Sequence, residues 1–154
     1  MQKKQFIYID TDRNKFYFSD REMKTLHRED GPAIEYAGGG KEWLLNGKFH
    51  REDGPAYELA DGYKEWWRNG ELHREDGPAI EHADGDKEWW RNGELHREDG
   101  PAVEYDNGHK AWRLNGERLT EEEFNARMNP VTELTLDEIA AKFGVSVDKL
   151  KIKK

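Results

Sequence analysis

The chain has 154 residues and a net charge of −8, which argues against a general affinity for nucleic acid or anionic lipid. Charged residues make up 38% of it, but six Trp, six Tyr and six Phe indicate a folded protein with a narrow aromatic core. Without cysteine it has no disulfides or thiolate metal sites, and no apolar run approaches the roughly 20 residues of a membrane span.

Residues 1–25 are predicted to form an N-terminal β-hairpin. Its strands, Phe6–Ile9 and Lys15–Ser19, are rich in β-forming residues and flank a turn at Asp10–Asn14. Because this segment does not match the repeats that follow, we interpret it as a cap over one edge of a sheet. The first residues, Met-Gln-Lys-Lys-Gln, lack the apolar core of a signal peptide, so we expect a cytoplasmic protein.

Residues 26–117 are predicted to form an array of four 23-residue repeats. The heptad His-Arg-Glu-Asp-Gly-Pro-Ala recurs every 23 residues with no insertion, which is the mark of a repeat architecture. We number the repeats as units 1 to 4 by their heptads, which stand at His27–Ala33, His50–Ala56, His73–Ala79 and His96–Ala102.

Each unit carries two turn signals between β-forming stretches. One is Asn-Gly, the strongest short hairpin signal, at 46–47, 69–70, 92–93 and 115–116. The other is rich in glycine, at 38–40, 60–62, 83–85 and 107–108, and Gly-Pro adds a bend within the heptad. We therefore expect a mainly β fold, an elongated single-sheet array of stacked hairpins, about one per unit, with a small helical cap at the C-terminal end.

Three positions are apolar in every unit, so we expect them to form the buried stripe. They hold Trp43, Trp66, Trp89 and Trp112; Ile34, Tyr57, Ile80 and Val103; and Leu26, Phe49, Leu72 and Leu95. The position after the first Trp holds Leu44, Trp67, Trp90 and Arg113. Since neighbouring side chains of a strand point to opposite faces, one residue of each Trp pair should lie on the outer face or in a bend.

Variation between units at positions 44/67/90/113, 36/59/82/105 and 40/63/86/109 indicates where a partner binds. Units 2 and 3 differ at only three positions, which are Tyr57/Ile80, Leu59/His82 and Tyr63/Asp86. Large aromatic residues and Arg dominate binding hot spots, although paired Trp residues also serve simply to pack both faces of a sheet. The candidate partner-binding residues are Trp67, Trp90, Arg68, Arg91, Leu44, Arg113, His82 and Tyr63.

The polar residues of the heptad point to a structural role and not to catalysis. Catalysis needs one asymmetric group of residues with separated pKa values, and four near-identical copies supply none. Equivalent His residues in successive hairpins should lie ~10 Å apart, too far to share one zinc ion, so we expect no metal, no cofactor and no enzymatic activity. Asp should instead cap the Gly-Pro bend, and His should contact the neighbouring unit. Structural roles in the repeat are assigned to His27, His50, His73, His96, Trp43, Trp66, Trp89 and Trp112.

Residues 118–154 are predicted to be a helical cap and tail. Thr120 with Glu123 forms a capping-box pattern for a helix over Glu121–Met128. A second such pattern, Thr135 to Glu138, opens a helix over Asp137–Phe143, and Ser146–Leu150 adds a short third.

This tail differs in charge from the rest of the chain. Five Lys and one Asp lie in residues 142–154, which leaves −12 on the residues before them. An acidic body suits a basic protein partner better than nucleic acid, although acidity also keeps proteins soluble. The tail helices are candidates for homo-oligomer contacts.

The run Trp-x-x-Asn-Gly-x-x-His-x-x-x-Gly-Pro, followed by Ala-Asp-Gly, resembles the MORN repeat in the variant form of bacterial and phage proteins. The resemblance covers residues 26–117 through four copies. It implies hairpins laid side by side in an open β-sheet that serves as a binding or scaffolding surface. The heptad also resembles that of uncharacterised phage proteins, which implies a phage protein that binds or inhibits a host protein in the host cytoplasm.

The tail Leu136–Leu150 is similar to a helix–turn–helix core and equally to the helical part of a lysin motif. Three functions therefore stay open. The preferred one is protein binding by the array. The alternatives are binding of a small ligand, such as a nucleotide signal, by Arg and Trp between units, and DNA-associated regulation through the tail.

Overall fold

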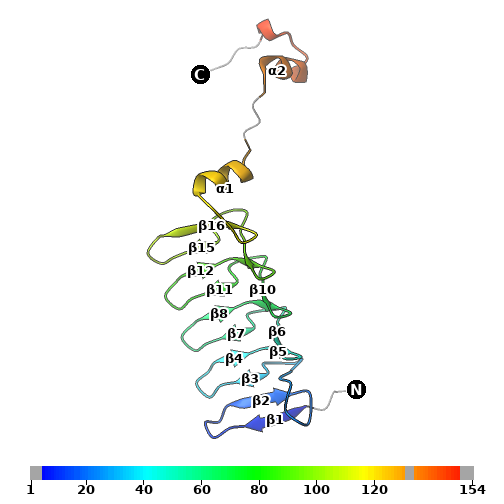
Figure 1. Cartoon of the computed structure of the whole chain (residues 1–154), viewed down its shortest axis with the longest axis vertical. Helices are drawn as coiled ribbons and strands as arrows, with labels where there is room; N and C mark the ends of the chain where they lie inside the picture. The colour runs from blue at the N-terminus through cyan, green and yellow to red at the C-terminus, as the bar shows by residue number, and fades with distance from the viewer. Residues whose placement is uncertain (1–4, 131–133, 150–154) are drawn as a thin grey trace.

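The computed structural model describes residues 5–130 and 134–149, and it confirms the predicted fold class. These residues form a long antiparallel β-sheet built from hairpins, followed by short helices (Figure 1). The strands run across the long axis of the molecule, with the N-terminal hairpin at one end and the helices at the other.

Eleven strands of the described residues make up the long sheet. Their order in the sheet follows their order in the chain, so each strand pairs with strands close to it in sequence. They are β1 (Phe6–Ile9), β2 (Lys15–Phe18), β3 (Ile34–Glu35), β4 (Lys41–Glu42), β7 (Tyr57–Glu58), β8 (Lys64–Glu65), β11 (Ile80–Glu81), β12 (Lys87–Glu88), β15 (Val103–Glu104), β16 (Lys110–Leu114) and β17 (Glu117–Leu119).

The N-terminal hairpin forms as predicted. β1 pairs with β2, and β2 pairs with β3 of unit 1, so β1 is the edge strand of the long sheet. Ile7, Tyr8 and Ile9 of this strand are exposed. The hairpin therefore covers unit 1 with β2, while these three apolar residues of β1 face solvent.

Each of units 1 to 3 supplies two hairpins, where one was predicted. The Gly-rich turn joins two strands of the long sheet, and the Asn-Gly turn joins the strands of a separate small sheet. Both residues of that turn have positive φ, for example +52° at Asn46 and +76° at Gly47, as a type I′ turn requires. The small sheets pair β5 (Leu44–Leu45) with β6 (Lys48–Phe49), β9 (Trp67–Arg68) with β10 (Glu71–Leu72), and β13 (Trp90–Arg91) with β14 (Glu94–Leu95).

The cross-strand register sorts the residues of units 1 to 4 into two rows on opposite faces of the long sheet. One row, on what we call the aromatic face, contains Ile34, Glu42, Tyr57, Glu65, Ile80, Glu88, Val103 and Ala111. The other, on what we call the charge-ladder face, alternates Glu and Lys through Glu35, Lys41, Glu58, Lys64, Glu81, Lys87, Glu104 and Lys110. Opposite charges thus face each other across every strand pair of this second row.

The most deeply buried residue of each unit is the last one of the heptad, which the sequence analysis did not single out. Ala33, Ala56, Ala79 and Ala102 have no exposed surface. In unit 1, a buried cluster forms around Ala33 together with Ile34 and Leu44. Partly buried Phe16, Leu26, Tyr36 and Phe49 pack against this cluster.

Of the three positions in the predicted buried stripe, the Ile and Val position is buried and the Leu and Phe position is only partly buried, whereas the prediction was wrong at the Trp position. Ile34, Ile80 and Val103 are buried. Trp43 remains partly exposed and, because it follows Glu42 by one residue, lies on the charge-ladder face. The same holds for the equivalent Trp of units 2 and 3. It is the residue after this Trp that lies on the aromatic face.

The C-terminal helices α1 (Glu121–Met128) and α2 (Leu136–Phe143) form with the predicted capping boxes at Thr120 and Thr135. Gly144 ends α2 in the left-handed conformation, and the short third helix is a 3₁₀ turn, η1 (Val147–Lys149); the predicted end at Leu150 lies outside the described residues.

Helix α1 covers the C-terminal end of the sheet. The Phe124 ring is only 3% exposed and lies 4.7 Å from the Trp112 ring, between centroids. Arg127 of the same helix donates to both carboxylate oxygens of Glu117, at 2.6 and 2.8 Å. One end of the sheet is thus closed by a helix and the other by a hairpin.

Candidate binding site

The Arg of each heptad builds the charge-ladder face. In unit 2 the guanidinium carbon of Arg51 lies 4.0 Å from the centroid of the Trp43 ring. Its Nε donates to Asp53 at 2.9 Å, and its Nη1 donates to the Pro55 carbonyl and to Glu58. The same set of contacts recurs in units 1, 3 and 4, with Tyr17 in the place of Trp43 in unit 1.

The prediction that the Asp of the heptad caps the bend through an Asx-type hydrogen bond is wrong. Its carboxylate instead accepts a hydrogen bond from Nε of the heptad Arg. This bond lowers the pKa of Asp30, Asp53, Asp76 and Asp99 below the ordinary value of 3.8. The Gly of the heptad leaves room for the Arg, because a Cβ at Gly54 would lie 2.9 Å from the guanidinium carbon of Arg51 and one of the two would have to shift.

The His of the heptad bonds to the Asn-Gly turn of its own unit. The predicted contact with a neighbouring unit is present at His73 and His96, which lie 3.3 and 3.4 Å from Arg68 and Arg91 of the preceding unit. His50 Nδ1 accepts from the backbone N–H of Asn69 in the next Asn-Gly turn, and the equivalent bond recurs at His27, His73 and His96. The other ring nitrogen faces the Glu two residues on, at 3.1–3.9 Å in the four units. Every polar residue type of the heptad thus has a partner within the array.

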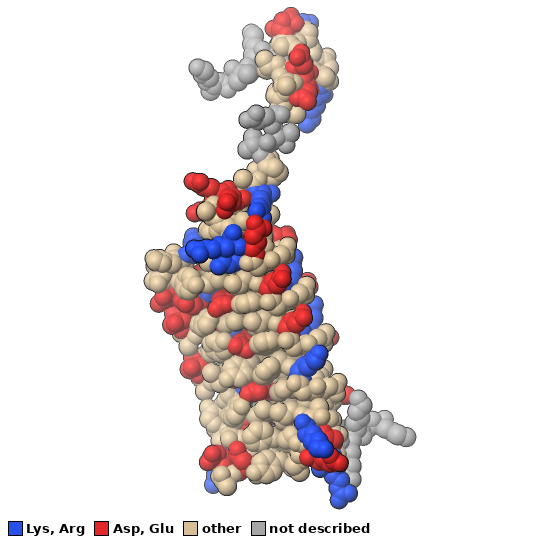
Figure 2. All heavy atoms as spheres, in the orientation of Figure 1, with Lys and Arg blue, Asp and Glu red and all other residues tan. Residues whose placement is uncertain are grey.

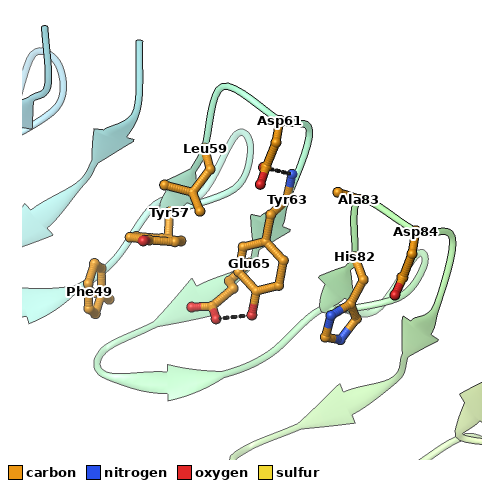
Figure 3. Close-up of a pocket in the computed structure, with 9 residues that line it drawn as sticks. All are labelled: Phe49, Tyr57, Leu59, Asp61, Tyr63, Glu65, His82, Ala83 and Asp84. Atoms are coloured by element: carbon orange, nitrogen blue, oxygen red, sulfur yellow. Dashed lines mark hydrogen bonds between the residues drawn. The ribbon is translucent and has the colours of Figure 1, made fainter. Parts of the chain in front are cut away.

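A hollow of about 620 Å³ lies on the aromatic face where units 2 and 3 meet (Figure 3). Its rings form a connected row: the centroids of Phe49 and Tyr57 are 6.0 Å apart, those of Tyr57 and Tyr63 6.0 Å, and those of Tyr63 and His82 5.2 Å. We call this hollow the aromatic groove. It is lined by Phe49, Tyr57, Leu59, Asp61, Tyr63, Glu65, His82, Ala83 and Asp84.

Carboxylates hold the aromatic side chains of the groove in place. Glu65 accepts from the hydroxyl of Tyr63 on one oxygen and from Nε1 of Trp67 on the other, the latter at 2.6 Å. Burial and then this contact with Glu65 raise the pKa of the Tyr63 hydroxyl above its ordinary value, so it stays a hydrogen-bond donor at neutral pH. Asp61 and Asp84 stand on the exposed turns at the rim, where each accepts from the backbone N–H two residues later.

The groove coincides with the positions at which units 2 and 3 differ. All three residues specific to unit 2, Tyr57, Leu59 and Tyr63, line it, and so does His82, one of the three specific to unit 3. Two units that are identical at 20 of 23 positions thus differ around one hollow.

The structure brings together only some of the predicted partner-binding residues. His82 and Tyr63 meet in the groove, and Trp67 flanks it, with its ring 5.5 Å from that of Phe49. Trp90 repeats the arrangement of Trp67 one unit later by donating to Glu88 at 2.8 Å. Tyr57, which the sequence analysis assigned to the core, is a groove residue.

The remaining candidates lie elsewhere. Leu44 is 6% exposed and belongs to the core of unit 1. Arg68 and Arg91 point away from the Trp residues that precede them and approach His73 and His96, at 3.3 and 3.4 Å. Arg113 donates to the carbonyl of Trp112. Trp67 and Arg68 therefore do not form a joint contact point, and neither do Trp90 and Arg91.

A second hollow of about 470 Å³ lies between the heptads of units 3 and 4 and is lined by residues of both charge signs. Its Arg74, Trp89 and Arg97 belong to the stacks described above. Within residues 5–130 and 134–149, no group of three or more His, Asp or Glu side chains is arranged to hold a metal ion. Among the helices in those ranges, none combines the length and apolar character that crossing a membrane requires.

Comparison of the sequence with protein-family models and with curated proteins gives no match. The resemblance to MORN repeats therefore stays a prediction.

Proposed function

We propose that this protein is a non-enzymatic protein-binding module whose contact surface is the aromatic groove. The observation that carries the proposal is the placement of Tyr57, Leu59 and Tyr63: the only residues that distinguish unit 2 from unit 3 all line one hollow.

The groove has the composition of a recognition site. It combines a row of large aromatic side chains with a few fixed polar groups, as ligand-binding surfaces do. Tyr63 and Trp67 are anchored by Glu65, so little side-chain entropy is lost when a partner covers them.

The charge of the groove supports a protein partner over a nucleotide or DNA. Its lining includes the carboxylates of Asp61, Glu65 and Asp84, which repel phosphate. On the side drawn in Figure 2 the array is mostly neutral, with acidic and basic side chains in separate spots, unlike the continuous basic stripe of nucleic-acid-binding proteins. The resemblance of the heptad to phage proteins adds the proposal that the partner is a host protein.

The test exchanges the residues of unit 2 for those of unit 3. The variant Tyr57→Ile/Leu59→His/Tyr63→Asp carries only residues that the array already accommodates at the equivalent positions, so it should fold. Wild type and variant are used to capture partners from bacterial lysate, and a recovered protein is then purified and titrated by calorimetry.

We expect the triple variant to lose its affinity for the partner while its melting temperature stays well above the temperature of the binding assay. Tyr105→His is the control, because it makes the same kind of exchange at an exposed position of unit 4 that does not line the groove. Equal affinity of the purified partner for wild type and triple variant would show that the groove is not the contact surface. Capture of nothing by the wild type would count against protein binding altogether.

A further inference from the structure

We infer that the aromatic groove accepts a basic side chain, Arg or Lys, from its partner protein. This inference rests on the proposed function and adds the chemistry of the contact: a cation is held between the rings of Tyr57 and Tyr63 and the rim carboxylates of Asp61 and Asp84.

The groove carries an uncompensated negative charge. Of its nine lining residues three are carboxylates, Asp61, Glu65 and Asp84, and none is Lys or Arg. Glu88, which accepts from Trp90 and faces His82 at 3.1 Å, adds a fourth carboxylate next to the lining. Low-dielectric walls concentrate the field of such charges within a hollow, so a cation is attracted and an anion excluded.

The rings supply the second half of a cation site. The ring centroids of Phe49 and Tyr57 are 6.0 Å apart, as are those of Tyr57 and Tyr63. Figure 3 shows Asp61 and Asp84 on the turns near these rings. Aromatic faces attract a guanidinium or ammonium group within about 6 Å of the ring centroid. Arg and Lys also place their aliphatic stems on apolar surface, here the side chain of Leu59.

The array already uses this chemistry on its other face. Each heptad Arg stacks on an aromatic ring at 3.9–4.1 Å while a carboxylate takes its Nε–H, as Arg74 does with Trp66 and Asp76. The groove offers the same two elements, rings and carboxylates, to a guanidinium that the chain does not itself provide there.

The equivalent places in the neighbouring units lack one element or the other. The residues at the positions of Tyr57 and Tyr63 are Ile34 and Gly40 in unit 1, and Ile80 and Asp86 in unit 3, so both rings are missing from these two units. In unit 4 the position of Glu65 holds Ala111, so the carboxylate is missing. The site is therefore expected once per chain.

The test uses four pentapeptides with blocked ends that carry Arg, Lys, Gln or Glu between two pairs of glycines. Each is titrated into the ¹⁵N-labelled full-length protein, and shifts of the backbone amides of Tyr63 and Ala83 are followed by NMR. We expect the Arg and Lys peptides to shift both amides with millimolar dissociation constants, which weaken as salt is raised. The Gln and Glu peptides should leave them unchanged.

The matched variant is Asp61→Asn/Asp84→Asn. Asn is already used at the equivalent position of unit 4, where Asn107 accepts from the His109 N–H at 2.9 Å, so the turns should keep their geometry while two charges are lost. Asp12→Asn/Asp106→Asn removes two exposed carboxylates that do not line the groove. We expect Arg-peptide affinity to fall about fivefold or more in the first variant and to stay unchanged in the second.

The cation assignment would be overturned by equal binding of the Gln peptide, by binding of the Glu peptide in place of the Arg peptide, or by unchanged Arg-peptide affinity in the groove variant. Silence of all four peptides would do the same. The two proposals fail separately: a protein partner lost on the unit-2 exchange with silent Arg and Lys peptides leaves the proposed function standing. If the Arg and Lys peptides bind but the unit-2 exchange does not change the affinity for the partner protein, the cation site stands and the proposed function fails.

Discussion

The guanidinium carbon of Arg74 lies 4.0 Å from the centroid of the Trp66 ring, and in unit 3 a Cβ at Gly77 would approach that carbon to 3.0 Å. The guanidinium thus fills the space between an aromatic ring and the backbone of the Gly-Pro bend. This sandwich explains why the heptad combines Arg with Gly, and it can be tested at the Gly position.

Gly54→Ala should lower the free energy of unfolding by about 1–3 kcal/mol, the usual cost of overpacking. The new Cβ would meet the Arg51 guanidinium carbon at 2.9 Å, and Arg51 has its Nε and Nη1 tied to three acceptors and cannot move without breaking those bonds. Urea unfolding measures the change. Gly38→Ala is the control, since a Cβ there meets nothing within 4 Å, and an equal loss in both variants would refute the explanation.

Acid should weaken the array through the Asp residues of the heptads. The hydrogen bond from Arg74 lowers the pKa of Asp76 in the folded protein below the ordinary 3.8, so this contribution is complete above that value and is lost as the pH falls through the lower, folded-state pKa. Urea midpoints measured from pH 7 down to pH 2 should decline steeply below about pH 4. Asp76→Asn should make that decline shallower, and identical profiles for both proteins would contradict the pairing.

The Asn-Gly turns should depend on the residue at their first position. Asn69 has a φ of +54°, a left-handed conformation that costs most residues other than Gly, Asn and Asp roughly 1–2 kcal/mol. Asn69→Ala should therefore lower the free energy of unfolding by about 1 kcal/mol, while Asn69→Gly should be near neutral. Thermal unfolding of the two variants side by side decides the matter, and equal melting temperatures would rule out the backbone explanation.

The helical cap should matter most to the unit that it covers. Phe124→Ala should cost about 3–5 kcal/mol, because a buried ring that contacts Trp112 is removed. Amide hydrogen exchange should accelerate in β16 and β17 before it does in β1 to β4, since units contact mainly their neighbours. Phe143→Ala is the control at a site that is 69% exposed; uniform acceleration along the whole array would argue against local capping.

Much of the fold could be predicted from the chain, because a strict 23-residue period, Asn-Gly turns and capping boxes are local signals that each specify one conformation. The faces on which the two adjacent Trp positions lie could not be predicted. Trp43 is apolar and invariant among the units, so it looked like core, yet its ring is covered by a guanidinium eight residues away. A guanidinium stacked on an aromatic ring stabilises the ring at a partly exposed position. The sequence pattern does not distinguish such a stacked ring from one buried in the core.

Part of the candidate site could also be predicted from the sequence. Tyr63 and His82 stood out because their positions vary between units. Tyr57 did not, since the equivalent residues Ile34, Ile80 and Val103 are all apolar and buried, and only the contacts of its ring with Phe49 and Tyr63 show that it borders a hollow.

The direction of the strands has a mechanical consequence. Because they run across the long axis in Figure 1, the hydrogen bonds of the long sheet run along it, and tension between the ends loads the strand pairs one after another. A single molecule stretched in this way should peel apart at low force from one end. Each opened unit of 23 residues would release up to ~80 Å of chain, at 3.3–3.6 Å per residue, so the extension record would count the repeats directly.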